Sequence, residues 1–345
     1  MNLPDRTFYL LGMGHRRKLL YRDGALTDLG TRRALRQWIV SREWVVPEDY
    51  AVVLRTRRGG DVRVYEDESG IFVDEDGERT RIAEGAVRLP RFDDRPHADL
   101  LRALHQELLV NIVPAGPVPN LLVYPKPWYR DAAMVAMCLG KTGNLRLIED
   151  WVTGLRDPFD RNNAGHCEPD NLGQALYLAS LFAGTHHPIV ASVLEQVPRY
   201  VRGKHLTGTT DFAEHPVYQT KWLKLGLRAL GLDDPYAIPE VVDSYSSLFW
   251  MDYRDHHVPG PRFDAGAAEN YPYLAWAEAH FHGDGPPAPL DTTRYPLTWE
   301  AHASEARYEE MAVVDAEYVA RGIAAPHSWH AAEMFLYLWD KGTGA

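Results

Sequence analysis

The chain has 345 residues, 45% of them hydrophobic, which is ample for one large domain or for a large domain with a smaller partner. Its formal net charge of −11 argues against nucleic acid or an anionic membrane as partner, because either would require clustered Lys and Arg. A neutral or cationic small ligand fits this composition better.

The first residues, MNLPDRTFYLLGMGHRRKLL, contain only the short apolar piece Phe8–Leu11 before charge returns. We therefore expect neither a signal peptide nor a membrane span in this chain. Cys138 and Cys167 lack CxxC spacing, which fits a reducing compartment and excludes a disulfide framework. The sequence thus predicts a cytoplasmic protein in which both thiols serve as packing residues.

Residues 1–92 are predicted to form a small β-rich domain. WVVPEDYAVVLRT, DVRVYEDES and IFVDED alternate apolar with polar residues, and glycines separate them. The segment TDLGTRRALRQWIVSREW interrupts this pattern and predicts a short helix that begins near Gly30-Thr31. GMGH, at Gly12–His15, lacks the third glycine of a dinucleotide-binding fingerprint and is not interpreted as one.

From Pro96 onward the hydrophobic period becomes that of helices. Leucines recur at helical spacing between Leu100 and Leu109, and the proline-rich VPAGPVPN ends this stripe. No strand pattern recurs after about residue 125. Further helices are expected at about 131–140, 145–155, 171–183, 188–200, 216–230, 238–248, 268–282, 303–320 and 328–339.

This succession of helices without heptads predicts hairpins packed side by side. A closed ring is the economical arrangement, with inner helices that are apolar nearly all round, as AAMVAMCL is. We therefore expect a mainly α fold: residues 93–345 form an (α/α) toroid of six or slightly fewer hairpins around a funnel, beside the N-terminal β-rich domain.

A polar and aromatic cluster lies directly in front of the apolar run 132–139. Asp131 can accept the free N–H groups of a first helical turn, so a cap beside an arginine partner is the plain structural explanation. Trp128 and Tyr129 favour a ligand site instead, because flat aromatic faces next to a bidentate hydrogen-bonding pair suit a sugar ring. The predicted substrate-binding residues here are Trp128, Tyr129, Arg130 and Asp131.

At this point the chain resembles a known family. PWYRDAAMVAMCLGKTGN is similar to the tryptophan-x-arginine-aspartate motif of the six-hairpin glycosidase superfamily, best known from glucoamylase-type enzymes. PHSWHAAEMFLYL resembles the serine-tryptophan-x-x-alanine helix that closes the same barrels. The resemblance covers residues of about 96–345. It implies a toroidal glycosidase in which Arg130 and Asp131 hold the hydroxyls of the terminal sugar.

Glycoside hydrolysis with inversion needs a protonated carboxyl group and a carboxylate about 6.5 to 9.5 Å apart. Glu168 closes a polar loop, and Pro169 fixes the chain beside it. By its order after the Arg-Asp pair, Glu168 resembles the family's general acid, although the family's usual tryptophan and paired glutamates are missing. Asp170 is a good helix-starting residue, and we count it as either a cap or a substrate-binding residue.

Glu300 is the candidate base. With Trp299, it ends a polar loop upstream of Ser328-Trp329, as the base does in the resembling enzymes. The alternative is a first-turn glutamate favoured by the helix dipole. Glu309 and the acids around it recur at helix spacing and are expected to form a solvated face.

Other loop-to-helix junctions supply polar and aromatic residues that could line the same cleft. His327 and His330 are three apart on a probable helix, but without HExxH or a cysteine partner they do not indicate zinc. DPFDRNN lacks the glycine and terminal glutamate of a calcium loop. We therefore predict no metal and no cofactor. The remaining predicted substrate-binding residues are Lys221, Trp250, Asp252, Glu269, Trp299 and His330.

The sequence thus predicts a glycosidase for a small carbohydrate or glycoside, with Glu168 as acid and Glu300 as base. Three alternatives stay open: a sugar epimerase or lyase that uses His or Tyr, a non-catalytic carbohydrate-binding or pathway protein, and an enzyme acting on a non-sugar natural product. The sugar, the linkage, the stereochemical outcome and the oligomeric state are not predicted.

Overall fold

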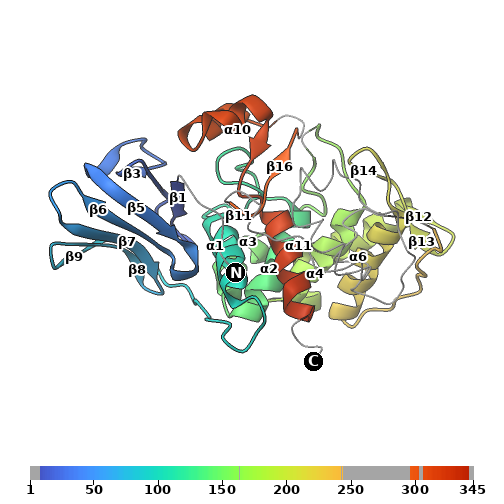
Figure 1. Cartoon of the computed structure of the whole chain (residues 1–345). Coiled ribbons are helices and arrows are strands. Elements are labelled where there is room, and N and C mark those ends of the chain that lie inside the picture. The colour runs from blue at the N-terminus through green and yellow to red at the C-terminus, as the bar shows by residue number, and fades with distance from the viewer. Residues whose placement is uncertain (1–7, 163, 242, 244–295, 303–305, 342–345) are drawn as a thin grey trace.

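The computed structural model describes residues 8–162, 164–241, 243, 296–302 and 306–341. Two antiparallel sheets lie at one end of the molecule and a group of helices at the other (Figure 1). Within the described ranges, no helix combines the length and the apolar character that crossing a membrane requires.

The first sheet is a four-stranded antiparallel meander in the order β1-β2-β3-β4. GMGH forms the connection after β1, where Gly12 has φ +111° and a Cβ would lie 2.4 Å from the Arg17 carbonyl oxygen. This glycine therefore serves a tight backbone approach. The strands are β1 (Phe8–Leu11), β2 (Leu19–Arg22), β3 (Ala25–Asp28) and β4 (Ala34–Gln37).

The second sheet is a five-stranded antiparallel meander, β5-β6-β7-β8-β9. Its alternation is clear in β7, where Val62, Val64 and Glu66 are buried and Asp61 and Arg63 are exposed. One face is thus packed and the other faces solvent. The elements are β5 (Val40–Val46), the 3-10 turn η1 (Pro47–Asp49), β6 (Ala51–Thr56), β7 (Asp61–Asp67), β8 (Gly70–Glu75) and β9 (Glu78–Glu84).

The core of the β-rich region is not made by the two sheets alone. Apolar residues of both sheets share one cluster with Leu122–Tyr124 and with Met311, Tyr318 and Ile323 from near the C-terminus. Arg22 also donates a 2.6 Å hydrogen bond to the Val314 carbonyl. Segments from within the helical part of the sequence therefore complete the packing of the sheets.

The long helices pack as a row in which α11 contacts α1 and α2, α2 contacts α4, and α4 contacts α6 (Figure 1). Their bounds are α1 (Ala98–Val110), α2 (Tyr129–Thr142), α4 (Asp170–Ser180), α6 (Pro216–Ala229) and α11 (Ser328–Lys341). The shorter elements are η2 (Leu145–Ile148), α3 (Glu149–Thr153), η3 (Gly184–His186), α5 (Pro188–Gln196), η4 (Val197–Arg199), η6 (Tyr308–Val313) and α10 (Ala316–Arg321).

Two glycines let α4 and α6 approach closely. A Cβ on Gly173 would lie 2.1 Å from the Trp222 carbonyl carbon, and one on Gly226 would lie 2.6 Å from the Gly173 carbonyl oxygen. Backbone therefore meets backbone at this crossing, which sets how closely the two helices pack.

Short antiparallel ribbons connect the helices. They are β10 (Ile112–Val113) with β11 (Gly116–Pro117), β12 (Val201–Arg202) with β13 (His205–Leu206), β14 (Thr209–Thr210) with β15 (Ala213–Glu214), and β16 (Glu300–Ala301) with β17 (Ile323–Ala324). The last pair joins two segments that flank η6 and α10. Two-residue strands leave no hydrophobic alternation, so the sequence did not reveal them.

The prediction of a mainly helical (α/α) toroid is wrong. The fold is mixed: a sizeable β-rich region of two sheets is joined to helices that are themselves linked by β ribbons. Helical periodicity located most of the helices but contained no information on ring closure. The toroid came from a packing argument and a resemblance, not from a pattern in the residues.

Several element predictions also need correction. The short helix expected within 27–44 is replaced by β4 and the first part of β5. The helix expected at 145–155 is a 3-10 turn followed by the five-residue α3, and the helix expected at 303–320 is η6 followed by α10. The helices expected at 238–248 and 268–282 lie mostly or wholly outside the described residues.

Candidate functional site

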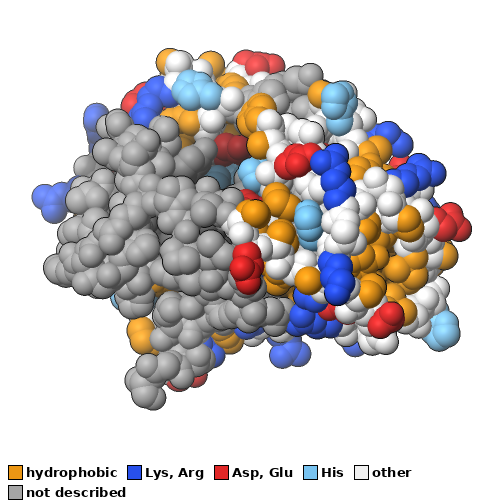
Figure 2. Space-filling view, turned by 90° about the vertical axis from the view of Figure 1, so that its right-hand side faces the viewer, with side chains coloured by type: hydrophobic (Ala, Val, Ile, Leu, Met, Phe, Trp, Pro, Cys, Tyr) orange, Lys and Arg blue, Asp and Glu red, His pale blue; other side chains and the backbone are white. Residues whose placement is uncertain are grey.

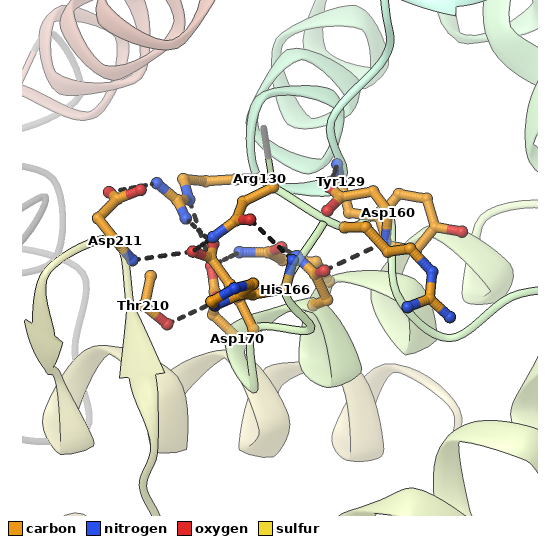
Figure 3. Close-up of polar contacts among 12 residues, drawn as sticks. Tyr129, Arg130, Asp160, His166, Asp170, Thr210 and Asp211 are labelled. Carbon is orange, nitrogen blue, oxygen red and sulfur yellow. Dashed lines mark hydrogen bonds and ion pairs between the residues drawn. The ribbon is translucent and has the colours of Figure 1, made fainter. Parts of the chain in front are cut away.

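Polar side chains meet where α2, α4 and α11 begin. Arg130 and Asp131 lie in the first turn of α2, Asp170 is the first residue of α4, and Ser328 is the first residue of α11. The β14–β15 ribbon, which precedes α6, adds Asp211 from its turn (Figure 3). Helix N-termini carry partial positive charge, so this location favours acidic side chains.

Arg130 binds three carboxylates at once. Its guanidinium nitrogens lie 2.6 Å from Glu168, 2.8 Å from Asp211 and 3.3 Å from Asp170 (Figure 3). The Arg130 side chain is only 4% exposed, so these contacts form largely out of water. The local balance of one cation against three acids favours retention of a proton among the carboxyl groups.

Glu168 receives two further hydrogen bonds, from the Asn162 side chain and from the Asp211 N–H, both 2.9 Å long. Burial raises the pKa of Glu168, the Arg130 charge lowers it, and the nearby Asp170 raises it again, with a net upward shift. Glu168 is therefore easier to protonate than an ordinary glutamate.

Asp170 is fully buried, and protein groups occupy its carboxylate. Besides Arg130, it accepts hydrogen bonds of 2.9 Å each from Gln174 and from the Thr210 hydroxyl. The N-cap position of α4 is Pro169, so the Asp170 side chain is no cap. These contacts favour a role in holding the network together.

Asp160 is an acid of this site that sequence analysis missed. It accepts a 2.5 Å hydrogen bond from the Tyr129 N–H, at the start of α2 (Figure 3). Burial, opposed by that hydrogen bond, raises the pKa of Asp160 to about 7. Tyr129 itself is buried, and its hydroxyl donates to the Asp157 carbonyl, so it braces this loop.

The second part of the site is an ion pair between Glu300 and His327, 2.6 Å apart. Strand β16 carries Glu300, and the His327 side chain lies just before α11. Burial opposes ionisation of both groups, but their mutual attraction outweighs it. It lowers the pKa of Glu300 and raises the pKa of His327. Glu300 therefore stays ionised, and a quarter of its side chain is exposed.

Asp131 lies between the two parts. Its carboxylate accepts a 3.2 Å hydrogen bond from the Ser328 hydroxyl. Burial raises the pKa of Asp131 to about 6, although the charges of His327 and Arg130 pull in the opposite direction. The predicted cap role is wrong, because Trp128 is the N-cap residue of α2 and makes no side-chain cap hydrogen bond.

His330 lies beside His327, with ring centroids 5.0 Å apart. Burial and the neighbouring His327 lower the pKa of His330 to about 3, so its ring is neutral. The Trp329 ring stacks on His330 at 5.5 Å and lies 5.4 Å from the Arg130 guanidinium. Trp329 thus bridges the two parts and is itself partly exposed.

His327 has a buried Nδ1 that meets no hydrogen-bonding partner within the described ranges. Glu300 raises the pKa of His327 and so favours its protonated form, in which this nitrogen is a donor, and an unmet buried donor costs free energy. An oxygen of a bound ligand would satisfy it. This orphaned donor, next to the Glu300 carboxylate, is consistent with a ligand site.

A buried glutamate behind the site was also missed. Glu107 of α1 accepts a hydrogen bond from the Leu297 N–H at 2.5 Å and one from the Thr298 hydroxyl at 2.7 Å. The Thr298 hydroxyl also lies 3.1 Å from the His327 carbonyl. A signal was present, because Glu107 follows Leu104 by three positions on the apolar stripe, where a charge requires a partner.

The other predicted residues have varied positions. Trp128 packs on Tyr124, with centroids 5.9 Å apart, and Lys221 is buried within α6. Trp299 packs at the edge of the β-rich core instead of among the acids. Within the described ranges, no group of three or more His, Cys, Asp or Glu is arranged to hold a metal ion. The predicted residues Trp250, Asp252 and Glu269 lie outside the described residues.

The molecular surface is hollowed on the face that Figure 2 turns toward the viewer. Acidic and histidine side chains come into view at depth in this recess. The recess gives small molecules a route from solvent to titratable groups.

Comparisons with known proteins gave no relative. No protein-family model matches the chain, and neither the curated proteins nor the solved structures contain a significant match. The resemblance to the six-hairpin glycosidase superfamily is therefore not supported, and with it falls the family assignment. Short motifs such as PWYRD and SWHAA occur too easily by chance to carry a family on their own.

Proposed function

We propose that this protein hydrolyses a glycosidic bond, with Glu168 as general acid and Glu300 as general base. In this scheme the Glu168 proton passes to the leaving oxygen as the carbon–oxygen bond breaks. A water molecule attacks the sugar carbon, and its proton passes to Glu300. No family relationship enters this proposal.

One observation carries it: two carboxyl groups from distant segments share a site, and their pKa values shift in opposite directions. The pKa of Glu168 is raised, and the pKa of Glu300 is lowered. Groups whose environments separate their pKa values are suited to serve as acid and base. The Glu300 side chain is 25% exposed and can therefore reach water, as a base must.

The surrounding groups fit a polyhydroxylated ligand. In its protonated form the buried His327 Nδ1 is a donor, and Trp329, two residues further on, is a partly exposed aromatic residue. Sugars combine hydroxyl groups with apolar C–H faces, so both features match this ligand class. Arg130 forms ion pairs with three acids. We therefore propose that it adjusts the pKa of Glu168, and not that it binds sugar hydroxyls as the sequence predicted.

The test is hydrolysis of a panel of aryl glycosides and oligosaccharides by the wild type and by Glu168→Gln and Glu300→Gln. We expect turnover by the wild type and losses of about 10²–10⁴-fold in each variant. The rate should fall at alkaline pH as Glu168 loses its proton above its raised pKa. It should fall at acidic pH as Glu300 gains one.

Glu309→Gln is the matched control, because Glu309 is an exposed acid of η6 whose loss should leave the rate unchanged. Thermal unfolding of each variant separates a chemical defect from a folding defect. If the wild type hydrolyses no member of the panel, or if both site variants keep full activity, the proposal is wrong.

The His327–His330 pair favours a second candidate, proton transfer on a sugar by an epimerase or lyase. Glu300 favours the protonated form of His327, whereas burial keeps His330 neutral, and the two rings lie 5.0 Å apart, as a proton donor and acceptor would. Incubation of sugars in D₂O tests this candidate by NMR. Deuterium incorporation that survives Glu168→Gln but not His330→Asn would favour it over hydrolysis.

A further inference from the structure

The β14–β15 hairpin ends in a two-residue turn made of Asp211 and Phe212. Thr210 pairs with Ala213, so these two residues alone reverse the chain. Asp211 has φ 52°, in the left-handed region that aspartate tolerates better than most residues. The turn thus has a residue suited to its geometry at its first position and an aromatic residue at its second.

This turn is anchored to the candidate acid. The Asp211 N–H donates to Glu168 at 2.9 Å, and the Asp211 carboxylate binds Arg130 at 2.8 Å (Figure 3). The preceding Thr210 hydroxyl donates to Asp170 at 2.9 Å and accepts from Gln219 at 2.8 Å. Contacts with several buried groups therefore fix the position of the turn relative to Glu168.

Phe212 extends from this fixed turn into solvent. Its side chain is 94% exposed, whereas the next most exposed large hydrophobic residue of the described part, Ile39, is at 69%. Two-residue turns ordinarily use Gly, Asn or Asp, which do not place an apolar ring in water. A single exposed hydrophobic residue is common, but this one combines almost full exposure with a rigid attachment beside a titratable site.

We infer that Phe212 stacks on the ring of the substrate's leaving group, an inference that rests on the proposed hydrolysis. The general acid protonates the leaving oxygen, so the leaving group lies on the Glu168 side of the bond. Phe212 directly follows Asp211, whose N–H donates to Glu168, so the turn that holds the acid also carries this ring. Phe212 therefore selects leaving groups that present a flat or pyranose ring over small alkyl groups.

The experiment compares the binding of phenyl and methyl glycosides of glucose, galactose, mannose and xylose, in both anomers, by titration calorimetry. Glu300→Gln is the background, since it blocks turnover and keeps Glu168. Adding Phe212→Ala should weaken binding of the phenyl glycoside by about 3- to 10-fold and leave the methyl glycoside within about 2-fold. Phe212→Trp should retain the phenyl preference, and Phe212→Leu, which is apolar but not flat, should lose it.

Ile39→Ala is the control, because it removes an exposed hydrophobic side chain from the β-rich region and should change neither affinity. Equal weakening for both glycosides, or an unchanged phenyl preference in Phe212→Ala or Phe212→Leu, overturns the inference. Turnover by wild type with binding independent of Phe212 overturns it but leaves the proposed function standing. Binding that depends on Phe212 without turnover overturns the proposed function and, with it, the leaving-group role of Phe212, although Phe212 would still contact the ring. Absence of binding overturns both.

Discussion

Among the described residues, the β-rich region and the helical region each bury one arginine, and the two differ in how the arginine charge is balanced. Arg16 pairs with a single carboxylate, Glu66, at 3.1 Å and donates its other hydrogen bonds to backbone carbonyls, among them Asp67 and Gly85. Arg130 faces three carboxylates. Arg16 thus has one acidic partner and joins the two sheets, whereas burial and the neighbouring Asp170 raise the pKa of Glu168 beside Arg130. Perturbed acids of this kind are common at functional sites.

The largest expected effect comes from removal of these arginines. Arg16→Met and Arg130→Met should each destabilise the fold by about 3–5 kcal/mol at pH 7, because each leaves a buried charge without its partner. The pH dependence of stability should distinguish the two variants. Without Arg130, Glu168 is left beside Asp170, whose charge raises the pKa of Glu168, whereas Glu66 keeps Lys18 as a cationic neighbour when Arg16 is removed. The Arg130 variant should therefore regain more stability between pH 7 and 5. Urea unfolding at both pH values measures this difference.

The comparison would fail if both variants regained the same stability on acidification, since the two sites would then hold equivalent charge. Arg55→Met gives the baseline, because its 3.7 Å ion pair with Asp61 is exposed and its loss should cost under about 0.5 kcal/mol at either pH.

A smaller effect, of opposite sign, is expected at Asp131. Its pKa of about 6 exceeds the value of 3.8 in an unfolded chain, so the folded state binds more protons between these pH values. Wild-type stability from this group is therefore present at low pH and is lost as the pH rises through about 6. Asp131→Asn keeps a polar partner for Ser328 without the charge and should stabilise the fold by up to about 3 kcal/mol at pH 7.

The gain should disappear near pH 4, where Asp131 is protonated in the folded protein. Denaturant unfolding of both proteins at pH 4, 5.5 and 7 measures it. A stability difference that does not change with pH would mean that the Asp131 carboxylate is not destabilised by burial. The substituted protein should also lose activity, because residues retained at a cost to stability are expected to serve function.

The two regions also differ in how far the sequence predicted them. In the β-rich region, Val62, Arg63 and Val64 alternate within one strand, and that period is local, so the sequence locates the strand. The segment 27–44 was mistaken for a short helix because its charged and apolar residues fit either period, and pairing with neighbouring strands decided the outcome. Local pattern was sufficient only where it favoured one structure clearly.

In the site, the sequence named Arg130, Glu168 and Glu300 but not what connects them. The sequence did not predict that Asp211, in the turn of the β14–β15 hairpin, contacts Glu168, because this contact depends on how α4 and α6 pack. Asp160 had no signal beyond being one more acid in a loop. Acidic residues are common at helix N-termini in general, so residue type alone does not distinguish a capping residue from a member of a buried network.

Glu107 gives the smallest predicted effect and tests how the site is supported. Its two oxygens hold the Leu297 N–H and the Thr298 hydroxyl, two to three residues before Glu300. In Glu107→Gln the amide NH₂ would face one of these donors, so we expect a loss of about 1–2 kcal/mol of stability.

If Glu107 positions the ion pair between Glu300 and His327, the loosened Glu300 contact should also lower the pKa of His327 toward its ordinary value. An NMR titration of the His327 ring measures that shift, which a purely structural role would not produce. Glu317→Gln, in an exposed i,i+4 pair of α10, should change neither quantity. A destabilised Glu107→Gln protein with an unmoved His327 titration would assign Glu107 to the core alone.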